Sequence, residues 1–184
     1  MLPVAGRAPW SVAGENRPMK FTIPLTIALP RQRVLELLSD PAHHPSWLRG
    51  LVAHELVEGR EGHVGAISRV EMRSGSSTME ARETITRRDP EQLEDIPADV
   101  VVHYERELVA EGMWSAAKEH LHDLGDGTTL WESENEYRFS ALPMRLLAPL
   151  MRGTFRKQTL AHMEDFRAFA EHGTDVRGEE GQPS

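Results

Sequence analysis

Three charged side chains lie in phase with apolar residues and are the strongest candidates for chemistry in this chain. Glu83, Arg106 and Glu119 each belong to a stretch in which apolar and polar residues alternate. Because successive side chains of a strand point to opposite faces, all three should share the apolar face of a sheet. Buried charges are costly unless they are paired, so an ion pair between Arg106 and a carboxylate is expected. Such a cluster would orient a carboxylate, hydroxyl or keto group of a ligand at the polar end of an apolar pocket.

The same three residues also have structural explanations. They would form an ion pair near the mouth of the sheet without any ligand, or a β-bulge would break the alternation and turn them to solvent. The sequence leaves these alternatives open.

His162 is the one candidate for a catalytic residue. It lies near the centre of the apolar face of a long helical stretch, and Gln158 precedes it by one turn. A neutral imidazole at this place would hydrogen-bond a ligand or act as a general base. The alternative is a core histidine bonded to a backbone carbonyl or to one of the glutamates.

The other histidines do not predict a metal site. His120 and His122 share one face of a strand, but Lys118 is on that face too, which is typical of a solvent-exposed face. Neither this pair nor His43 and His44 has a third ligand at a recognisable spacing. The chain has no cysteine, no phosphate-binding loop and no dinucleotide fingerprint, so no metal and no cofactor are expected.

Alternating segments predict the sheet that must position these residues. The segments are 20–28, 51–58, 64–73, 78–88, 100–108, 113–124 and 128–139. Short turns, such as Ser74-Gly75-Ser76 and Gly125-Asp126-Gly127, join the segments from Leu51 onward, so the strands should pair antiparallel. Pro24 places the first strand at an edge or a bulge.

Two helical regions complete the pattern. Residues 30–50 predict two short helices, and residues 143–172 predict one long amphipathic helix that Pro149 should kink. One side of that long helix carries Leu147, Met151, Phe155, Gln158, His162, Phe166 and Phe169.

Composition limits the possible classes of function. The 184 residues carry a net charge of −8, which disfavours nucleic-acid binding because that role needs a basic surface. No apolar run approaches the roughly 20 residues that cross a bilayer, so stable membrane insertion is not expected. The lack of cysteine fits a reducing, cytoplasmic location. Residues 1–18 should be a flexible leader, 19–172 a single domain and 173–184 a disordered tail.

The order of these elements resembles the START/polyketide-cyclase superfamily (SRPBCC), the helix-grip fold of the birch-pollen allergen. The resemblance covers residues 19–172 and rests on Ile27-Ala28-Leu29-Pro30, on His44-Pro45-Ser46-Trp47-Leu48, on Gly125-Asp126-Gly127 and on Leu142-Pro143. It implies an α+β fold in which a curved antiparallel sheet of six or seven strands wraps around the long C-terminal helix. It also implies an elongated apolar cavity between the sheet and that helix. Members of the superfamily include lipid carriers, hormone receptors and aromatase/cyclases.

The strand phases and the helix face, taken with this resemblance, predict the residues that contact a ligand. They are Trp47, Glu83, Tyr104, Arg106, Glu119, Trp131, Tyr137, Met151, Phe155, His162 and Phe166. The expected partner is a small apolar or amphipathic molecule, held mainly through burial of apolar surface. The oligomeric state is not set by the sequence.

Two other classes of function stay open beside a ligand-binding protein, which is favoured. An enzyme of the cyclase or dehydratase type would act on a keto-containing or aromatic substrate, with His162 or Glu119 as base and Arg106 stabilising an enolate. A protein-interaction module would need a large exposed apolar patch. The polar phase of the strands does not predict such a patch.

Overall fold

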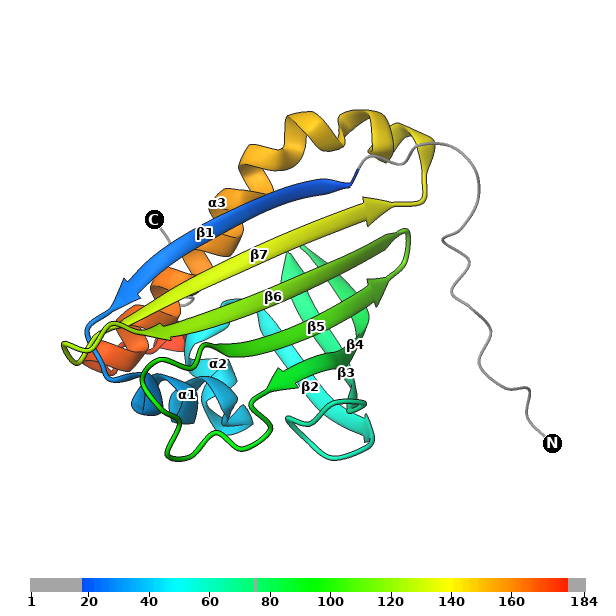
Figure 1. The fold of residues 1–184 in the computed structure, drawn as a ribbon. Coiled ribbons are helices and arrows are strands. Elements are labelled where there is room, and N and C mark those ends of the chain that lie inside the picture. The colour runs from blue at the N-terminus through cyan, green and yellow to red at the C-terminus, as the bar shows by residue number, and fades with distance from the viewer. Residues whose placement is uncertain (1–17, 75, 179–184) are drawn as a thin grey trace.

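The computed structural model describes residues 18–74 and 76–178 and shows one antiparallel sheet with a long helix along it (Figure 1). The strands are β1 (Met19–Ile27), β2 (Leu51–Glu58), β3 (Ile67–Ser74), β4 (Ser77–Asp89), β5 (Val102–Ala110), β6 (Met113–Asp123) and β7 (Thr129–Phe139). The sheet has seven strands in the order β1-β7-β6-β5-β4-β3-β2. Strands β2 to β7 are thus neighbours in chain order, and β1 adds to the edge beside β7. Gly75, in the predicted hairpin turn, lies outside the described residues.

The helices are α1 (Arg31–Ser39), α2 (His44–Trp47) and α3 (Leu142–His172), with short 3₁₀ turns η1 (Pro41–His43) and η2 (Val176–Gly178). Figure 1 shows α3 passing behind β1 and β7, along one face of the sheet, while α1 and α2 lie near one end of it. This is the helix-grip arrangement that the sequence predicts, with two short helices after the first strand and one long helix at the end.

The first strand illustrates how the alternation sets the faces. Along β1 buried and exposed residues alternate at every position, and Phe21, Ile23 and Leu25 are buried. Pro24 points to the exposed side of a strand that has a neighbour on one side only. Proline is tolerated there because an edge strand has unpaired backbone positions.

Helix α3 has one proline in its first turn, a second proline inside it and a glycine at its end. Pro143 lies in its first turn, where the missing N–H is harmless. Pro149 lies inside the helix, and Figure 1 shows that α3 changes direction along its first half. At the other end Gly173 adopts a φ of 71°, and its N–H bonds the carbonyl of Phe169 at 2.8 Å. A left-handed glycine is a common helix terminator, because a side chain would be strained there.

Two predicted boundaries are corrected. Strand β3 begins at Ile67 rather than at residue 64, because Gly65 has a φ of 86° and Ala66 N bonds His63 O in a turn. The described chain also continues beyond Gly173. Val176 is only 3% exposed and the Arg177 guanidinium bonds Ser46 Oγ at 3.2 Å. The first part of the predicted tail therefore contacts the domain as far as Arg177, and the disorder of the tail stays a prediction. The predicted leader, apart from Pro18, and residues 179–184 lie outside the description.

Candidate functional site

A cavity of about 460 Å³ lies between the face of the sheet that carries α3, the two short helices and α3 itself. Its size is within the range of small-molecule sites, which is about 300–1,000 Å³. Apolar wall is provided by residues such as Leu35, Val70, Leu108 and Phe155. Charged side chains from three adjacent strands enter the same space, so the cavity has a polar region.

Arg106 on β5 is at the centre of this polar region. Its Nε lies 3.8 Å from Glu83 Oε2 on β4, and an η nitrogen lies 3.9 Å from Glu119 Oε1 on β6. Arg106 lines the cavity, and a third of its side chain is accessible. Burial tends to lower the pKa of Arg106, but the two carboxylates outweigh it and raise that pKa. The guanidinium therefore stays charged where a ligand can reach it.

Glu83 connects Arg106 to two histidines. His54 on β2 donates through Nε2 to Glu83 Oε1 at 3.3 Å, and its ring lies 5.3 Å from that of His44. Burial alone would raise the pKa of Glu83. The His54 hydrogen bond and the Arg106 charge outweigh it and hold that pKa below the usual range. Burial also lowers the pKa of His44 to about 4, helped by the nearby His54. His44 is thus a neutral imidazole at physiological pH.

Glu119 behaves in the opposite way. Trp131 Nε1 donates to Glu119 Oε2 at 2.6 Å, and the carboxyl side chain is 5% exposed. Burial raises the pKa of Glu119, and Arg106, Trp131 and Ser133 offset this only in part. The site therefore holds two carboxyl groups whose pKa values are displaced in opposite directions. Such a divergence is found where one group keeps its proton and the other stays ionised.

Three buried polar atoms of the cavity wall have no hydrogen-bond partner among the described residues. They are Trp47 Nε1 and Arg88 Nε, which are donors, and His54 Nδ1, which is an acceptor when Nε2 carries the proton. Buried polar atoms are bonded in the great majority of proteins, because leaving one unpaired costs about 1–3 kcal/mol. All three residues line the cavity. Their unpaired atoms are therefore placed to meet a polar group inside it.

The α3 side of the cavity carries His162. Burial lowers the pKa of His162, which Asp165 partly opposes. Asp165 is itself held by Arg49, whose guanidinium bonds its two carboxylate oxygens at 3.1 and 3.0 Å. A neutral His162 facing the cavity can donate and accept hydrogen bonds.

Aromatic rings close the cavity beneath the middle of α3. The ring of Tyr137 lies 4.7 Å from Phe155 and 5.9 Å from Phe21, centroid to centroid. On the β5 side, burial raises the pKa of Tyr104 to about 12, so that hydroxyl stays protonated. These phenols add two hydroxyl groups to a mostly apolar wall.

The structure places most of the predicted ligand-binding residues around one space. Trp47, Glu83, Tyr104, Arg106, Glu119, Trp131, Tyr137, Phe155 and His162 line the cavity. Glu83, Arg106 and Glu119 thus face inward, and the β4 bulge between Ile85 and Arg87 does not turn Glu83 to solvent. That these residues hold a ligand remains a prediction.

Phe166 and Met151 depart from their expected positions, since neither lines the cavity. Phe166 is fully buried, with its ring edge-on to Trp47 at 5.1 Å and to Trp131 at 5.4 Å. It is a core residue that fastens α3 to α2 and β7. Met151 lies one turn before Phe155 on α3, beyond the end of the cavity wall.

His54 and His44 are site residues that the sequence interpretation missed. Segment 51–58 has apolar residues at both parities, Leu51 and Val57 at one and Val52 and Leu56 at the other, so its pattern does not indicate which way His54 points. A register shift between Leu51 and Ala53 breaks the alternation of β2. His44 was considered only beside His43, as a histidine pair without a third metal ligand. No signal in the sequence alone would have paired these two histidines with Glu83.

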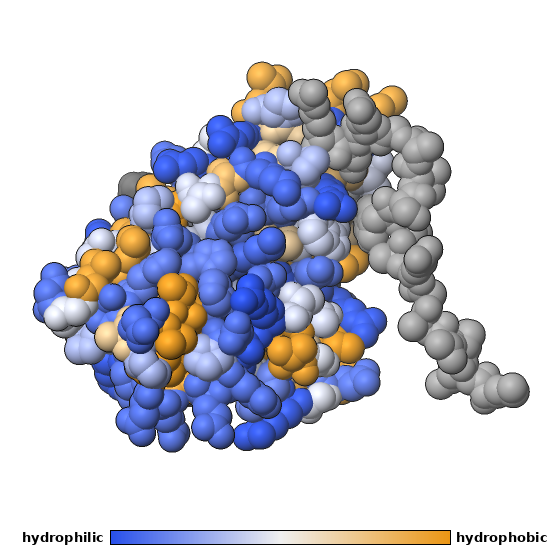
Figure 2. Space-filling model, viewed as in Figure 1, coloured by the Kyte–Doolittle hydropathy of each residue, from blue (hydrophilic) through white to orange (hydrophobic). Residues whose placement is uncertain are grey.

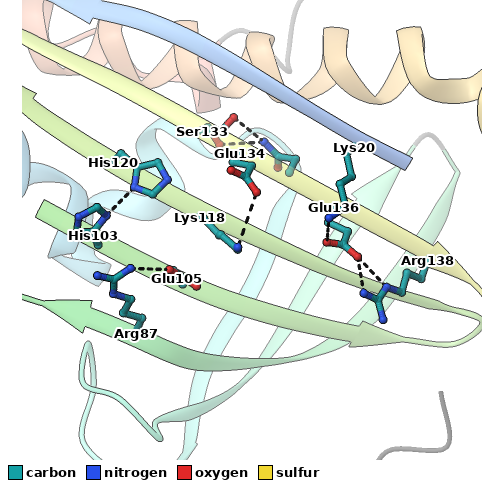
Figure 3. Close-up of polar contacts among 11 residues, drawn as sticks. Lys20, Arg87, His103, Glu105, Lys118, His120, Ser133, Glu134, Glu136 and Arg138 are labelled. Atoms are coloured by element: carbon teal, nitrogen blue, oxygen red, sulfur yellow. Dashed lines mark hydrogen bonds and ion pairs between the residues drawn. The ribbon is translucent and has the colours of Figure 1, made fainter. Parts of the chain in front are cut away.

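The opposite face of the sheet carries ordinary surface pairs (Figure 3). His103 Nδ1 lies 2.7 Å from His120 Nδ1, and Lys118 Nζ lies 3.7 Å from Glu134 Oε1. His122, the second half of the suggested histidine pair, lies 3.0 Å from Glu132 instead. Across the described ranges, no group of three or more His, Asp or Glu side chains could hold a metal ion.

A second, smaller cavity of about 320 Å³ lies where the end of β1 meets the last turns of α3. Its walls include Thr26, Glu164 and Arg167, and Glu171 accepts a hydrogen bond from Ala28 N at 2.6 Å nearby. It is more open than the first cavity and lacks a cluster of buried charges, so we do not assign a site to it. Within residues 18–74 and 76–178, no helix combines the length and apolar character needed to cross a membrane.

Solved structures of low sequence identity share this fold. The Zhui aromatase/cyclase from Streptomyces sp. R1128 has a TM-score of 0.63 at 15% identity, covering 84% of this chain and 94% of that one. Norcoclaurine synthase from Thalictrum flavum, in complex with dopamine and hydroxybenzaldehyde, has a TM-score of 0.60 at 17% identity, covering 100% and 99%. The protein Ara h 8.0201 has a TM-score of 0.62 at 13% identity, covering 83% and 97%. These likenesses confirm the helix-grip fold.

No curated protein sequence matches this chain significantly. A sequence model of one family does match, over residues 18–171, and its description is polyketide cyclase / dehydrase and lipid transport. The match spans the whole sheet and nearly all of α3, and it agrees with the superfamily that the sequence pieces resemble. The chain belongs to the polyketide cyclase / dehydrase and lipid transport family.

Proposed function

We propose that this protein binds a small amphipathic molecule, with its apolar body against the aromatic wall and its polar group at the Arg106 end of the cavity. The observation that carries the proposal is the set of three unpaired buried atoms in the cavity wall, Trp47 Nε1, Arg88 Nε and His54 Nδ1. The first two need an acceptor, and His54 Nδ1 needs a donor when its Nε2 carries the proton. A hydroxyl group, or a hydroxyl beside a carbonyl, offers both.

The charges of the polar region favour an uncharged head group. Arg106 is positive and Glu83, with its lowered pKa, is negative, so these two charges balance each other without a ligand. Burial raises the pKa of Glu119, so a further negative charge beside it is disfavoured. An added full charge would need a partner that the cluster already uses. A phenol, alcohol or ketone fits better than a strong acid or a quaternary amine.

Trp47→Phe tests this proposal because it removes the unpaired N–H and keeps an aromatic ring. Calorimetry would first find a ligand in a library of aromatic alcohols, ketones and single-chain lipids. The variant should bind that ligand about five- to tenfold more weakly, the value of one hydrogen bond. It should also lose some stability, because Phe fills less of the space beside Phe166. Trp114→Phe is the matched control, since the Trp114 N–H bonds Glu107 at 3.2 Å and Trp114 does not line the cavity. Equal affinity of Trp47→Phe and wild type would refute this placement of the polar group.

A second candidate function is catalysis of a cyclisation or dehydration. The divergence of the pKa values of Glu83 and Glu119 around one guanidinium favours it, because an ionised base, a protonated acid and an anion stabiliser are then within one site. In this version Glu119 is the proton donor, the neutral His162 or the ionised Glu83 is the base, and Arg106 stabilises an enolate. His162→Ala and Glu119→Gln should then lower kcat with little effect on KM. Unchanged turnover in both variants would exclude these roles.

The cytoplasm is our proposed location for the protein, in keeping with a chain that contains no cysteine.

A further inference from the structure

The first turns of α3 expose more apolar surface than the sequence predicted. Leu142, Leu146, Leu147 and Leu150 are 63%, 71%, 48% and 80% exposed. Leu147 was expected to face inward, yet half of it is accessible. Figure 2 shows apolar side chains gathered at the top of the molecule, where α3 begins. We call these four residues the leucine patch.

Single exposed leucines are common on protein surfaces, but a cluster on one short stretch of helix is not. Leu142, Leu146 and Leu150 follow one another at four-residue spacing, so they form a row along the helix. On the opposite side, Met144 and Phe155 pack against the core. The helix is therefore fastened to the domain by one apolar face and carries a second apolar face without a partner in the described part of the chain.

The leucine patch is flanked by positive charge. Arg145, Arg152, Arg156 and Lys157 are the charged residues of the stretch 141–163, which contains no Asp or Glu. Arg145, Arg152 and Arg156 fall on one side of the helix, next to the leucine row. This concentration is unexpected in a chain whose net charge is −8. Acidic residues reappear on α3 only from Glu164, beyond the patch.

Neighbouring elements do little to cancel this charge. Arg152 Nε donates to the backbone carbonyl of Lys20 at 2.9 Å, which leaves its charge uncompensated by an acid. The nearby Glu136 already pairs with Lys20 at 2.8 Å and with Arg138 at 2.6 Å. One exposed acid, Glu111, lies in the turn where Gly112 O accepts from Ser140 N. The end of the molecule that carries the leucine patch is therefore locally basic.

We propose that the first turns of α3 dock on an anionic lipid surface, with the leucines in the interface and the basic side chains among the lipid head groups. A helix with one apolar stripe, basic flanks and modest total hydrophobicity is the type that lies in the plane of a membrane surface. A second copy of this chain is a poorer occupant, because a symmetric contact would bring the same basic residues together. Docking of this kind needs no membrane-spanning helix.

The position of the cavity gives the docking a consequence. Phe155, Gln158 and Thr159 line the cavity, and they follow the leucine patch on the same helix within about two to three turns. Docking would thus bring one end of the cavity close to the lipid, from which an amphipathic molecule could enter. The docking itself does not depend on the proposed ligand, so the two can be tested separately.

Co-sedimentation with vesicles tests the proposal on the full chain. Wild type should sediment with vesicles of equal parts phosphatidylcholine and phosphatidylglycerol, and it should not sediment with phosphatidylcholine alone. Each basic residue near such a surface contributes roughly a fivefold factor to binding. Arg145→Gln/Arg156→Gln should therefore lower the partition coefficient by roughly 25-fold, and added salt should also lower that of wild type.

Leu146→Ser/Leu150→Ser should abolish sedimentation, because it removes the most exposed apolar pair. Val57→Ser/Val64→Ser is the matched control, since these valines are 68% and 58% exposed away from α3. Light scattering on the same variants gives the mass in solution. If Leu146→Ser/Leu150→Ser bound the vesicles as strongly as wild type does, the proposal would be overturned. A wild-type dimer that the leucine substitutions dissociate without any lipid dependence would also overturn it, because it would assign the patch to a second copy.

Discussion

Both faces of the sheet carry charged residues of the same types, but these residues are buried on the cavity face and exposed to water on the outer face. Glu119 and Lys118 are consecutive on β6, yet the Glu119 carboxyl is 5% exposed beside Arg106 whereas the Lys118–Glu134 pair is 41% and 43% exposed. On the cavity side the pKa of each carboxyl is displaced, in one direction at Glu83 and in the other at Glu119. On the outer side water screens each pair. The face of the sheet, more than the residue type, decides which charges can take part in binding or chemistry.

The largest difference between the faces should appear when one cation is removed from each. Arg106→Met leaves Glu83 and Glu119 without their shared partner inside the cavity, which should cost about 3 kcal/mol of unfolding free energy. The accessible third of Arg106 keeps the cost from being larger. Lys118→Met on the outer face should cost less than about 1 kcal/mol. Urea unfolding at neutral pH measures both. Equal losses would mean that the two faces do not differ as described.

The next largest effect should be a pH dependence caused by His44. Its pKa is about 4 in the folded protein against 6.5 for a free histidine. A depressed pKa contributes stability that is present above pH 6.5 and is lost as the pH falls toward 4. The loss of unfolding free energy over this interval is up to about 3 kcal/mol. His44→Gln should lose less stability than wild type over that interval, and His122→Gln on the outer face should behave like wild type. Parallel pH profiles of wild type and His44→Gln would contradict the burial of a neutral His44.

The smallest effect should come from Glu119, where Arg106, Trp131 and Ser133 offset much of the cost of burial. A raised pKa contributes stability that is complete below the free value of 4.5 and is lost as the pH rises through the folded value. Glu119→Gln does not titrate, so it should gain stability relative to wild type as the pH rises from 4.5. Glu134→Gln, on the outer face, should show no such trend. Thermal unfolding of wild type and both variants at a series of pH values above 4.5 measures these trends. A Glu119→Gln variant that gains no stability relative to wild type would contradict the raised pKa of Glu119.

The comparison also explains what could be predicted from the sequence. The inward phase of Glu83, Arg106 and Glu119 followed from alternation, because the two-residue period holds around each of them and the shift in β4 comes only after Ile85. His54 was missed because a register shift at the start of β2 breaks that period. A one-residue irregularity changes which face a side chain occupies.

The helix was predicted well in extent and less well in orientation. A helical wheel assigns one inward-facing stripe to the whole of α3. The helix bends, however, and its first turns lie at the edge of the sheet, near the start of β1 and the end of β7 (Figure 1). Leu147 therefore lies outward, and Phe166 packs among tryptophans instead of lining the cavity. Such details depend on the tertiary path of the helix, which its periodicity does not contain.

Native mass spectrometry of the protein with the ligand library tests the central claim most directly, if wild type is compared with a variant whose cavity is filled. Ala117 faces the cavity on β6, and Lys118 beside it faces out. We predict that wild type and Lys118→Phe retain the mass of one bound amphipathic molecule and that Ala117→Phe, while folded, does not. Wild type that binds nothing in the library, or Ala117→Phe that binds as wild type does, would contradict a ligand site between the sheet and α3.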